Sequence, residues 1–436
     1  MRRSGTTCVV TAMALTLALI LSSCGGPEVV RRPEVTKPAV PVVTPGVPLD
    51  RPPVVRVLIL DARNNVRVKA TTSFHIGGEL EVSEGTRLEE SGDFTVRCAQ
   101  ELVRFQRGGE AILDAPVVSI VPHGRGHIYI NGRAYRGGFI FRPVHGKVIT
   151  INVLEIDDYL KGVLPAEIGY LKSDQFEAYR VQAIASRSYA LSKLEEKKGE
   201  MYDLQATIMD QVYKGVNGED PEASRAVDET RGRVALWRGE PVRAYYSACC
   251  GGHTADIRIC WPWKDSYPYL HGGRDASERG GSNSFCSRSP HFRWRVHWSG
   301  NTLERMLKKT LPGELKIRRD AVGSLTDLKQ LGTSPDGRIT SIKIVTTHGT
   351  YRIDGDRIRW VLKPDPNSNA ILKSTLFKMS VKRARGKVVS VNLVGGGNGH
   401  GVGMCQAGAV RMAEFGYSAE EILGHYYPGI VIVRFY

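Results

Sequence analysis

The sequence contains none of the patterns that identify the common nucleic-acid-binding folds. Its 436 residues hold no zinc-finger spacing, no signature of an RNA-binding sheet and no basic region followed by heptads. The glycine-rich segment 395–408, GGGNGHGVGMCQAG, matches neither G-x-x-x-x-G-K-[ST] nor G-x-G-x-x-G, which argues against a nucleotide-binding loop. We therefore expect no nucleic-acid partner. The formal net charge of +15 still favours an anionic partner, such as an anionic lipid or an acidic polymer.

The sequence also has no apolar run long enough for a confident membrane span. Its best candidate, CVVTAMALTLALIL at 8–21, is short and is soon followed by proline-rich sequence. Two arginines precede it, and LSSC at 21–24 resembles the bacterial lipobox, in which the cysteine becomes lipidated after cleavage. We expect a signal peptide at 1–23 and an exported protein anchored to a bacterial membrane through acyl chains on Cys24. Gly25 carries no retention signal of the Asp type, so the outer membrane is favoured.

The residue pattern of the remaining chain changes twice, after residue 53 and after residue 136. Residues 24–53 comprise the lipidated cysteine and a linker rich in proline and valine, whose composition favours an extended spacer. Residues 54–136 show short apolar runs broken by turn residues, which predicts a β-rich N-terminal domain with a hairpin at Asn131-Gly132. Residues 137–436 mix helical and strand patterns, and this order predicts an α+β fold.

Several helices carry their own start and stop signals. Segment 173–199 reads as a helix, with Asp174 and Glu177 as a possible capping box and Gly199 as its end. Segment 219–232 begins with Asp220 as cap and Pro221 at the first position. Near the C-terminus, one helix is expected to stop at Gly416 and the next to begin at Ser418, with Glu421 completing a capping box.

One isolated acid stands in the segment YLKGVLPAEIGY at 159–170. Glu167 is flanked by apolar residues, and no other acid occurs between Asp158 and Asp174. A solvated turn would have more polar neighbours, and a buried structural glutamate would need a partner to offset its desolvation. A working acid is the third reading, because burial raises the pKa of a carboxyl group toward neutral pH. The flanking residues do not choose among these.

Six segments of the chain, including the one with Glu167, are together similar to one known family. GNGHGVGMCQAGAVRMAEFGYSAEEILGHYYPG resembles the C-terminal signature of the SpoIID/LytB family, which contains sporulation protein D and the amidase enhancer. YLKGVLPAEIG, QAIASRSYAL, DQVYKG, AYYSACCGGHTAD and CSRSPHFRW precede it in the family's order. Cys405, where family members commonly have serine, and the doubled Cys249-Cys250 depart from the pattern.

This resemblance implies a lytic transglycosylase that cuts peptidoglycan strands already stripped of stem peptides. The catalytic glutamate of the family falls on Glu167. Ordinary glycosidases need two carboxylates, whereas here the 6-hydroxyl of the muramic acid ring attacks its own C1, so one glutamate can serve as acid and then as base. The alternative is a non-catalytic, glycan-binding activator of a cell-wall amidase, as suggested by the amidase-enhancer branch.

Each of the next three sets of candidate residues has a possible role in substrate binding and a possible structural role. Arg187 is either a ligand for the lactyl carboxylate of muramic acid or part of an ion pair on the helix surface. Gln211 and Tyr213 either line the groove or end a strand. His400 either binds a sugar hydroxyl or braces the glycine-rich loop, and Gln406 in the same segment is a further candidate for substrate binding.

The cysteines could form either a disulfide or a zinc site. Export permits disulfides, and we expect one between Cys250 and Cys286 and no cofactor. Zinc bound by Cys250, His253 and Cys286 is the alternative, although the irregular spacing of these residues is weak support for a structural zinc site.

Overall fold

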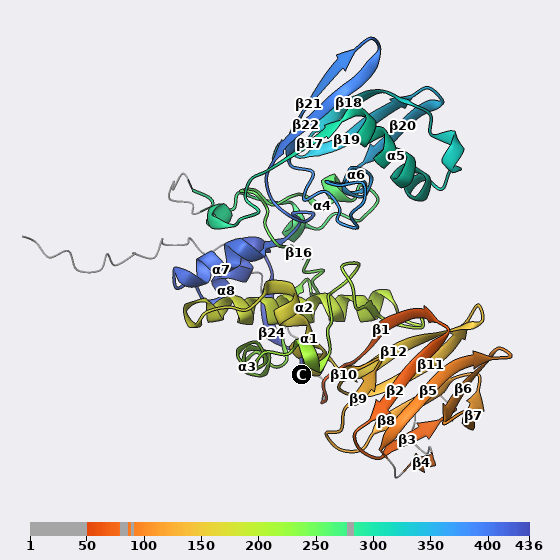
Figure 1. Cartoon of the computed structure of the whole chain (residues 1–436). Helices are drawn as coiled ribbons and strands as arrows, with labels where there is room; N and C mark the ends of the chain where they lie inside the picture. Colours follow the sequence, from red (N-terminus) through yellow and green to blue (C-terminus); the bar gives the residue numbers. More distant parts are fainter. Residues whose placement is uncertain (1–49, 79–85, 89–90, 277–282) are drawn as a thin grey trace, which may run out of the picture. The chain divides into compact units, whose positions relative to one another are not determined.

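The structure is a computed structural model that describes residues 50–78, 86–88, 91–276 and 283–436 (Figure 1). Its helices and its several sheets confirm the predicted α+β class. The predicted signal peptide, Cys24 and nearly all of the linker lie outside the described residues. Within the described ranges, no helix has both the length and the apolar character needed to cross a bilayer.

The strands of the N-terminal part form two sheets. Their bounds are β1 (Val54–Arg63), β2 (Asn65–Ala70), β3 (Phe74–Gly77), β4 (Thr86–Leu88), β5 (Gly92–Ala99), β6 (Leu102–Arg107), β7 (Glu110–Ala115), β8 (Val118–Pro122), β9 (Ile128–Ile130), β10 (Arg133–Tyr135), β11 (Gly138–Val144), β12 (Lys147–Glu155) and β13 (Leu204–Gln205). One sheet has the order β13-β1-β12-β11-β8-β3-β4, and the other has the order β10-β9-β2-β5-β6-β7.

Alternating side chains hold these two sheets together. In β2 every second residue is buried and the others face solvent, the pattern of a strand with one covered face. Phe74 from the first sheet meets Phe94 of the second, with ring centroids 5.3 Å apart, and Phe105 lies 5.0 Å from Phe94. The predicted hairpin at Asn131-Gly132 is confirmed between β9 and β10, and both turn residues have positive φ.

The expected boundary at residues 136/137 falls between β10 and β11. Strands β11 and β12 nevertheless belong to the first sheet, where β12 pairs with β1 from Val54↔Glu155 onward. The β-rich part therefore continues to Glu155 in the structure. This pairing could not be read locally because the two strands are separated by most of the N-terminal part. The pairing also determines where the helix with Glu167 begins, because β12 leads directly into that helix.

The central part is built around helices. Their bounds are α1 (Ile156–Ile168), η1 (Ser173–Gln175), α2 (Phe176–Glu196), η2 (Val216–Gly218), α3 (Pro221–Glu229), α4 (Ile257–Cys260), η3 (Pro268–Leu270), η4 (Phe285–Arg288), α7 (Gln406–Glu414) and α8 (Ala419–Tyr426). The short strands among them are β14 (Arg233–Trp237), β15 (Glu240–Pro241), β16 (Tyr246–Ser247), β23 (Met404–Cys405) and β24 (Val431–Arg434). Helix α2 contacts α1, α3, α7 and α8 (Figure 1), and its small side chains permit this close packing.

The predicted helix caps are confirmed where the two hydrogen-bonded residues are close in sequence. Asp220 accepts the N–H of Ala223, and Ser418 with Glu421 forms the predicted capping box. The expected box of Asp174 and Glu177 is wrong, because α2 begins after Gln175 and its first turn faces α8. The carboxylate of Glu177 instead pairs with Arg180 and accepts the N–H of Ala419.

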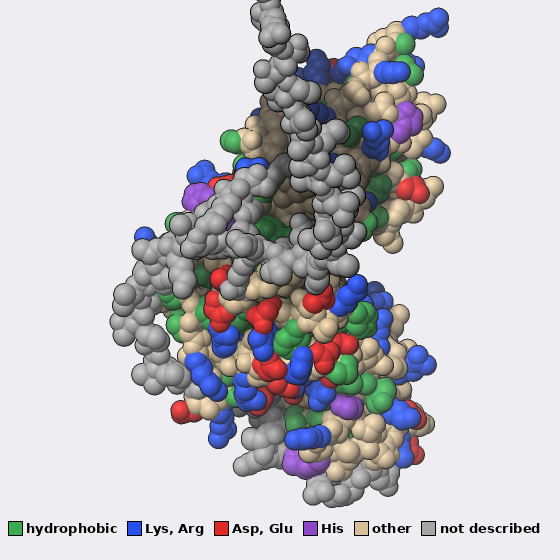
Figure 2. Space-filling view, turned by 90° about the vertical axis from the view of Figure 1, so that its left-hand side faces the viewer, with side chains coloured by type: hydrophobic (Ala, Val, Ile, Leu, Met, Phe, Trp, Pro, Cys, Tyr) green, Lys and Arg blue, Asp and Glu red, His purple; other side chains and the backbone are tan. Residues whose placement is uncertain are grey.

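Residues 294–395 have a hydrophobic core of their own. Their elements are β17 (Trp294–Ser299), α5 (Gly300–Leu315), η5 (Arg319–Ala321), β18 (Leu325–Thr333), β19 (Ile339–Thr346), β20 (Gly349–Asp354), α6 (Arg357–Val361), β21 (Phe377–Ala384) and β22 (Lys387–Gly395). They form two three-stranded sheets, β17-β22-β21 and β18-β19-β20, over a cluster that includes Trp298 and Leu307. On the face drawn in Figure 2, Asp and Glu gather at the level of the central helices, whereas Lys and Arg are spread more widely.

Candidate active site

Glu167 lies in the last turn of α1, which Gly169 ends with a φ of 81°. The segment 211–215 crosses this helix at Gly162, where an added Cβ would lie 2.6 Å from the ring of Tyr213. Glycine at this position therefore allows the segment to approach closely. As a result, the backbone N–H of Val212 donates a hydrogen bond of 2.5 Å to Oε1 of Glu167.

The surroundings of Glu167 favour its protonated form. Burial raises the pKa of this carboxyl from 4.5 to about 7, although the hydrogen bond from Val212 acts in the opposite direction. Within the described part of the chain, no Lys or Arg forms an ion pair with it. Burial also raises the pKa of the neighbouring Tyr159 and Tyr246 well above 10, so both stay neutral. Of the three explanations considered for Glu167, an acid without a compensating positive charge fits these surroundings best.

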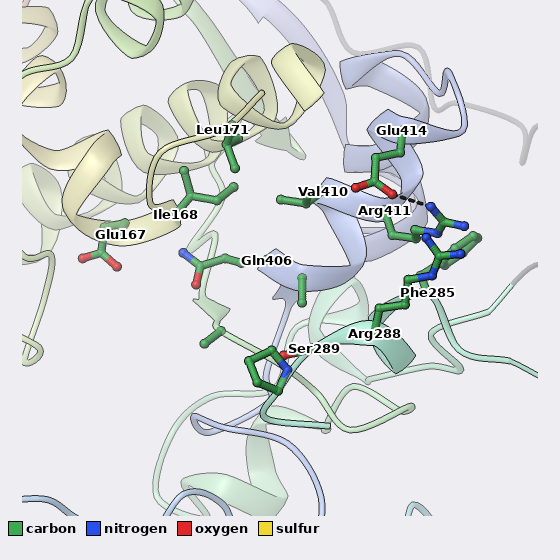
Figure 3. A pocket seen from close by; sticks show the side chains of 13 residues that line it. Glu167, Ile168, Leu171, Phe285, Arg288, Ser289, Gln406, Val410, Arg411 and Glu414 are labelled. Atoms are coloured by element: carbon green, nitrogen blue, oxygen red, sulfur yellow. Dashed lines mark hydrogen bonds and ion pairs between the residues drawn. The ribbon is translucent and has the colours of Figure 1, made fainter. Parts of the chain in front are cut away.

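Glu167 opens onto a cavity of about 350 Å³ (Figure 3). Helices α1 and α7 and the segment around η4 supply its walls. The other lining residues are Ile168, Leu171, Ala248, Phe285, Arg288, Ser289, Pro290, Gln406, Ala407, Val410, Arg411 and Glu414. The cavity is therefore mainly apolar near the acid and carries charged groups at a distance from it (Figure 3).

Those charged groups differ in whether they have partners. Glu414 pairs with Arg411 and accepts a hydrogen bond of 2.8 Å from Gln175. Burial would raise the pKa of Glu414, but these bonds hold it below its usual value. Arg288 forms no hydrogen bond or ion pair with a described residue, although its charge also acts on Glu414. The cavity thus combines one acid whose pKa lies near neutral pH, one acid that its partners keep ionised, and one guanidinium without a partner among the described residues.

Gln406 is the candidate that the structure brings together with Glu167. It begins α7, lines the same cavity, and donates a hydrogen bond of 3.2 Å from Nε2 to Oε1 of Gln182 on α2. This bond holds the amide group of Gln406 in place at the cavity wall. Gln406 therefore remains a candidate for substrate binding.

Gln211 and Tyr213 lie behind the site. Gln211 is fully buried, accepts a hydrogen bond from the hydroxyl of Tyr159 at 3.1 Å and donates one to that of Tyr246 at 3.0 Å. Tyr213 is buried too and donates to Oδ1 of Asn152. The expectation that they line the groove is corrected: they position the segment that donates to Glu167.

Arg187 also needs a correction. Its side chain is fully buried and donates to Oδ1 of Asp157 from Nε at 3.0 Å and from Nη2 at 2.8 Å. Carbonyl oxygens of Val227 and Arg233 accept its other N–H groups. These contacts use four of the five N–H groups of a side chain that is fully buried and does not line the cavity of Glu167, so Arg187 is not placed to bind a ligand there. The ion-pair reading was therefore the better one, although the pair is buried rather than on the surface.

His400 braces the glycine-rich loop. Its Nδ1 accepts the N–H of Val402 at 3.0 Å, and its ring lies 4.9 Å from that of Trp261. Burial lowers the pKa of this imidazole to about 4, so it is neutral at physiological pH. His400 does not line the cavity of Glu167, which corrects its assignment to substrate binding.

The cysteines of the expected disulfide are close but unbonded. Sγ of Cys250 and Sγ of Cys286 lie 3.6 Å apart, and both thiols are free. The side chains of Asp275 and Cys405 occupy the same small volume. His253 is not part of this group, because its Nδ1 faces the carbonyl oxygen of Thr254. Of the three zinc ligands considered as the alternative, the structure thus brings Cys250 and Cys286 together but not His253.

Sequence reasoning assigned no role to three charged residues of the cavity, Arg288, Arg411 and Glu414. Arg288 belongs to the family-like segment CSRSPHFRW, so its position could have been found there. Arg411 and Glu414 are three residues apart in a predicted helix, a spacing that predicts their ion pair but not the cavity they face.

Comparison with known proteins identifies related chains. Residues 144–237 match the family described as Stage II sporulation protein, and residues 263–403 match a domain of unknown function, DUF8618. An uncharacterized protein of Brachyspira hyodysenteriae is 31% identical over 307 residues, which is 70% of this chain and 74% of that protein. Stage II sporulation protein D of Bacillus amyloliquefaciens is 26% identical over 65% of this chain and 75% of its own length.

The amidase enhancer of Bacillus subtilis is 27% identical over 63% of this chain, but this match covers only 40% of the enhancer. The matches include the helix with Glu167, which falls within the Stage II sporulation protein region. The chain therefore belongs to the SpoIID/LytB family, and its function is related to the bacterial cell wall.

Proposed function

We propose that this protein is a lytic transglycosylase that cleaves peptide-free peptidoglycan strands and leaves 1,6-anhydro ends. The observation that carries the proposal is the state of Glu167: a carboxyl group with a pKa of about 7, without a cationic partner among the described residues, at the wall of a cavity. Such a group is half protonated at neutral pH, which suits a residue that must first donate and then accept a proton.

The reaction needs only this one acid. Glu167 protonates the glycosidic oxygen while the bond from that oxygen to C1 breaks. The 6-hydroxyl of the same sugar then attacks C1, and its proton returns to the carboxylate of Glu167. No water is consumed. The hydroxyl is held beside C1 by the ring itself, so the high effective molarity of an intramolecular reaction is available.

We assign to Arg288 the binding of the lactyl carboxylate, one of the two roles considered for Arg187. It lines the cavity of Glu167 and has no hydrogen-bond or ion-pair partner among the described residues. The lactyl carboxylate of muramic acid is free once the stem peptide has been removed. A guanidinium recognises such a group through charge-assisted, bidentate hydrogen bonds. This pairing accounts for a preference for peptide-free strands.

A second function is favoured by one comparison. The relative called amidase enhancer supports a role as a partner of a cell-wall amidase. In that case the cavity would bind glycan, and Glu167 would contribute to its shape without proton transfer.

The test uses Glu167→Gln, which preserves the acceptor for the Val212 N–H but cannot cycle a proton. Purified variants are incubated with denuded glycan strands, and anhydro ends are measured by mass spectrometry. General acid–base assistance typically contributes about 10²–10⁴-fold, so we expect cleavage to fall by at least about 10²-fold. Glu155→Gln, an exposed acid just before the same helix, serves as the matched control and should cleave normally.

Three other outcomes would point to a different acid, a different reaction or a different function. Near-normal cleavage by Glu167→Gln would show that another group is the acid. If Glu414→Gln also abolishes cleavage and the wild-type products carry reducing ends, the protein is a two-carboxylate hydrolase. If the wild type releases no glycan product but both it and Glu167→Gln stimulate an amidase, the activator function is correct.

A further inference from the structure

A second cavity, of about 530 Å³, lies at the C-terminal end of α2. The end of α2, the β14–β15 hairpin and the segment around η3 form its walls, and it shares no described lining residue with the cavity of Glu167. We propose that this cavity is a second binding site for a glycan strand and takes its N-acetylhexosamine units. That the strand is peptidoglycan rests on the proposed function, whereas the site itself does not.

Aromatic rings form much of the wall of this cavity. The segment 261–269, WPWKDSYPY, has four aromatic residues in nine, whereas Phe, Trp and Tyr make up 8% of the chain. The ring of Tyr269 lies 5.4 Å from that of Tyr267 and 5.7 Å from that of Trp237, measured between centroids. Tyr267 and Trp237 are only partly buried. Their rings can therefore receive the C–H face of a sugar, which is attracted to the negative face of an aromatic ring.

The polar groups at these rings include both donors and acceptors. Arg238 forms no hydrogen bond or ion pair with a described residue, and its guanidinium carbon lies 4.4 Å from the centroid of the Trp237 ring. This stacking holds the guanidinium at the cavity. The exposed carboxylates of Glu195 and Glu240 also have no partner in the described part of the chain. All three side chains are thus available to a ligand.

The mixture of charges favours a neutral ligand. Three carboxylates and two guanidinium groups line the cavity, those of Glu195, Glu196, Glu240, Arg238 and Arg243. An anion would be repelled by the acids and a cation by the arginines. The hydroxyl and acetamido groups of an N-acetylhexosamine can instead donate to the carboxylates and accept from the guanidinium groups. Binding here would therefore not need the free lactyl carboxylate that we assign to Arg288.

Arg238 occupies a turn position that favours other residues. A two-residue turn joins β14 to β15, and Arg238 has a φ of 52° and Gly239 a φ of 88°. Turns with two positive φ angles strongly prefer Asn, Asp or Gly at the first of these positions. The turn itself does not account for an arginine, whereas its stacking on Trp237 and its place in the cavity wall do.

Helix α2 sets the distance between the two cavities. Gln182, which accepts the hydrogen bond from Gln406 of the first cavity, and Ser192 of the second cavity are ten residues apart on this helix. They are therefore separated by roughly 15 Å along its axis. This is several sugar units, so a short oligomer occupies one site only. A long strand held at the second site has a raised effective concentration at the first.

The experiment titrates the full chain with the N-acetylglucosamine trimer of chitin, in a Glu167→Gln background that leaves the ligand intact. Arg238→Asn and Tyr267→Ala should each weaken one binding step by about 10-fold, because each removes a direct contact with the sugar. Asparagine suits the positive φ of the turn, so Arg238→Asn should melt no lower than its parent. Trp263→Ala removes an exposed ring of the same segment that does not line the cavity, and it should bind normally.

Cleavage of long denuded strands provides a second measurement. With Glu167 restored, Arg238→Asn should raise the KM for long strands and leave cleavage of short oligomers unchanged. If the wild type cleaves no glycan, the proposed function fails, and the titration alone decides the second site.

The proposal is overturned if neither variant weakens trimer binding, or if Trp263→Ala weakens it equally. An unchanged KM for long strands in an active enzyme would also overturn it. So would binding of a peptide with the proline-rich sequence 33–53 in place of the sugar, since aromatic grooves also bind such peptides.

Discussion

Glu167 shows how one side chain acquires a function from its surroundings. Ile168 and Leu171, which follow it in sequence, line the same cavity, and partial burial among such residues disfavours the charged carboxylate. The single backbone donor, Val212, orients it without supplying a positive charge. An ion pair would have lowered the pKa, as the partners of Glu414 do in the same cavity. The two acids are thus set to different protonation states by their partners.

The raised pKa predicts a pH-dependent stability difference between wild type and Glu167→Gln. Because the folded-state pKa is about 7 rather than the ordinary ~4.3, the folded protein binds more protons between these values. The contribution of Glu167 to the free energy of unfolding is therefore greatest below pH ~4.3 and is lost as the pH rises through about 7. Glutamine does not titrate.

Melting temperatures of the two proteins should consequently coincide near pH 4.5, and the variant should be more stable at pH 8, by on the order of 3 kcal/mol. Other titrating groups are shared and cancel in the difference. A variant that is less stable at every pH would show that Glu167 serves mainly as a structural hydrogen-bond partner.

Arg288→Gln tests recognition separately from chemistry. In the inactive Glu167→Gln background, binding of denuded glycan should weaken about 10-fold or more, since a hydrogen bond to a charged group contributes about 1.5–3 kcal/mol. Binding of chitin oligomers, which lack the lactyl carboxylate, should not change. Arg63→Gln, an exposed arginine in β1, is the control. Equal losses for both ligands would mean that Arg288 only shapes the cavity.

At the scale of elements, the approach of segment 211–215 to α1 holds Glu167 in place. Gly162→Ala would put a methyl group 2.6 Å from the ring of Tyr213 and 2.9 Å from the carbonyl oxygen of Gly215. Overpacking of this kind typically costs about 1–3 kcal/mol. We expect a lower melting temperature and reduced cleavage, because the Val212 N–H moves away from the carboxylate.

Gly424→Ala in α8 is a matched substitution. An added Cβ there has no atom within 4 Å, so the change should be neutral or stabilise the helix by up to about 1 kcal/mol. If Gly162→Ala behaves like Gly424→Ala, the packing behind Glu167 tolerates more than these distances indicate.

The elements also show what sequence could and could not predict. Asp220, Ser418 with Glu421, and Asn131-Gly132 work through bonds within three residues, and their signals were read correctly. Arg187 and Glu177 resemble surface residues in sequence, but their partners Asp157 and Ala419 lie far along the chain. The grouping of Cys250 with Cys405 is equally non-local. The role proposed for Glu167 came from a family-like motif, and its protonation state needed the structure.

For the whole molecule, the positive charge is unevenly distributed. Residues 294–395 hold more than twice as many Lys and Arg as Asp and Glu, and thus account for most of the net charge of +15. This part has its own core and overlaps the matched domain of unknown function. A polyanionic glycan would be attracted to it beyond the contacts made in the cavity.

Glycan binding by the full chain should therefore weaken as salt rises, because exposed charges are screened within about 10 Å at 0.1 M salt. Lys382→Glu with Lys387→Glu, two exposed residues of the β21–β22 hairpin, should reduce binding at low salt and flatten the salt dependence. Cleavage of short glycans at saturation should be unchanged, which distinguishes this effect from damage to the cavity. A salt dependence unaffected by the double variant would place the attraction elsewhere.

The pairing of β1 with β12 has a mechanical consequence. The carbonyl oxygen of Pro53 accepts the N–H of Ile156 at 2.9 Å, and the ladder continues through Val54↔Glu155 and Val55↔Leu154. If the expected lipid on Cys24 anchors the chain, a pulling force would enter this ladder at the end where Pro53 and Ile156 pair. It would break the hydrogen bonds one after another, as in unzipping, instead of loading them together in shear. Tension on the tether would thus reach the first turn of α1 before it reached the rest of the β-sheets.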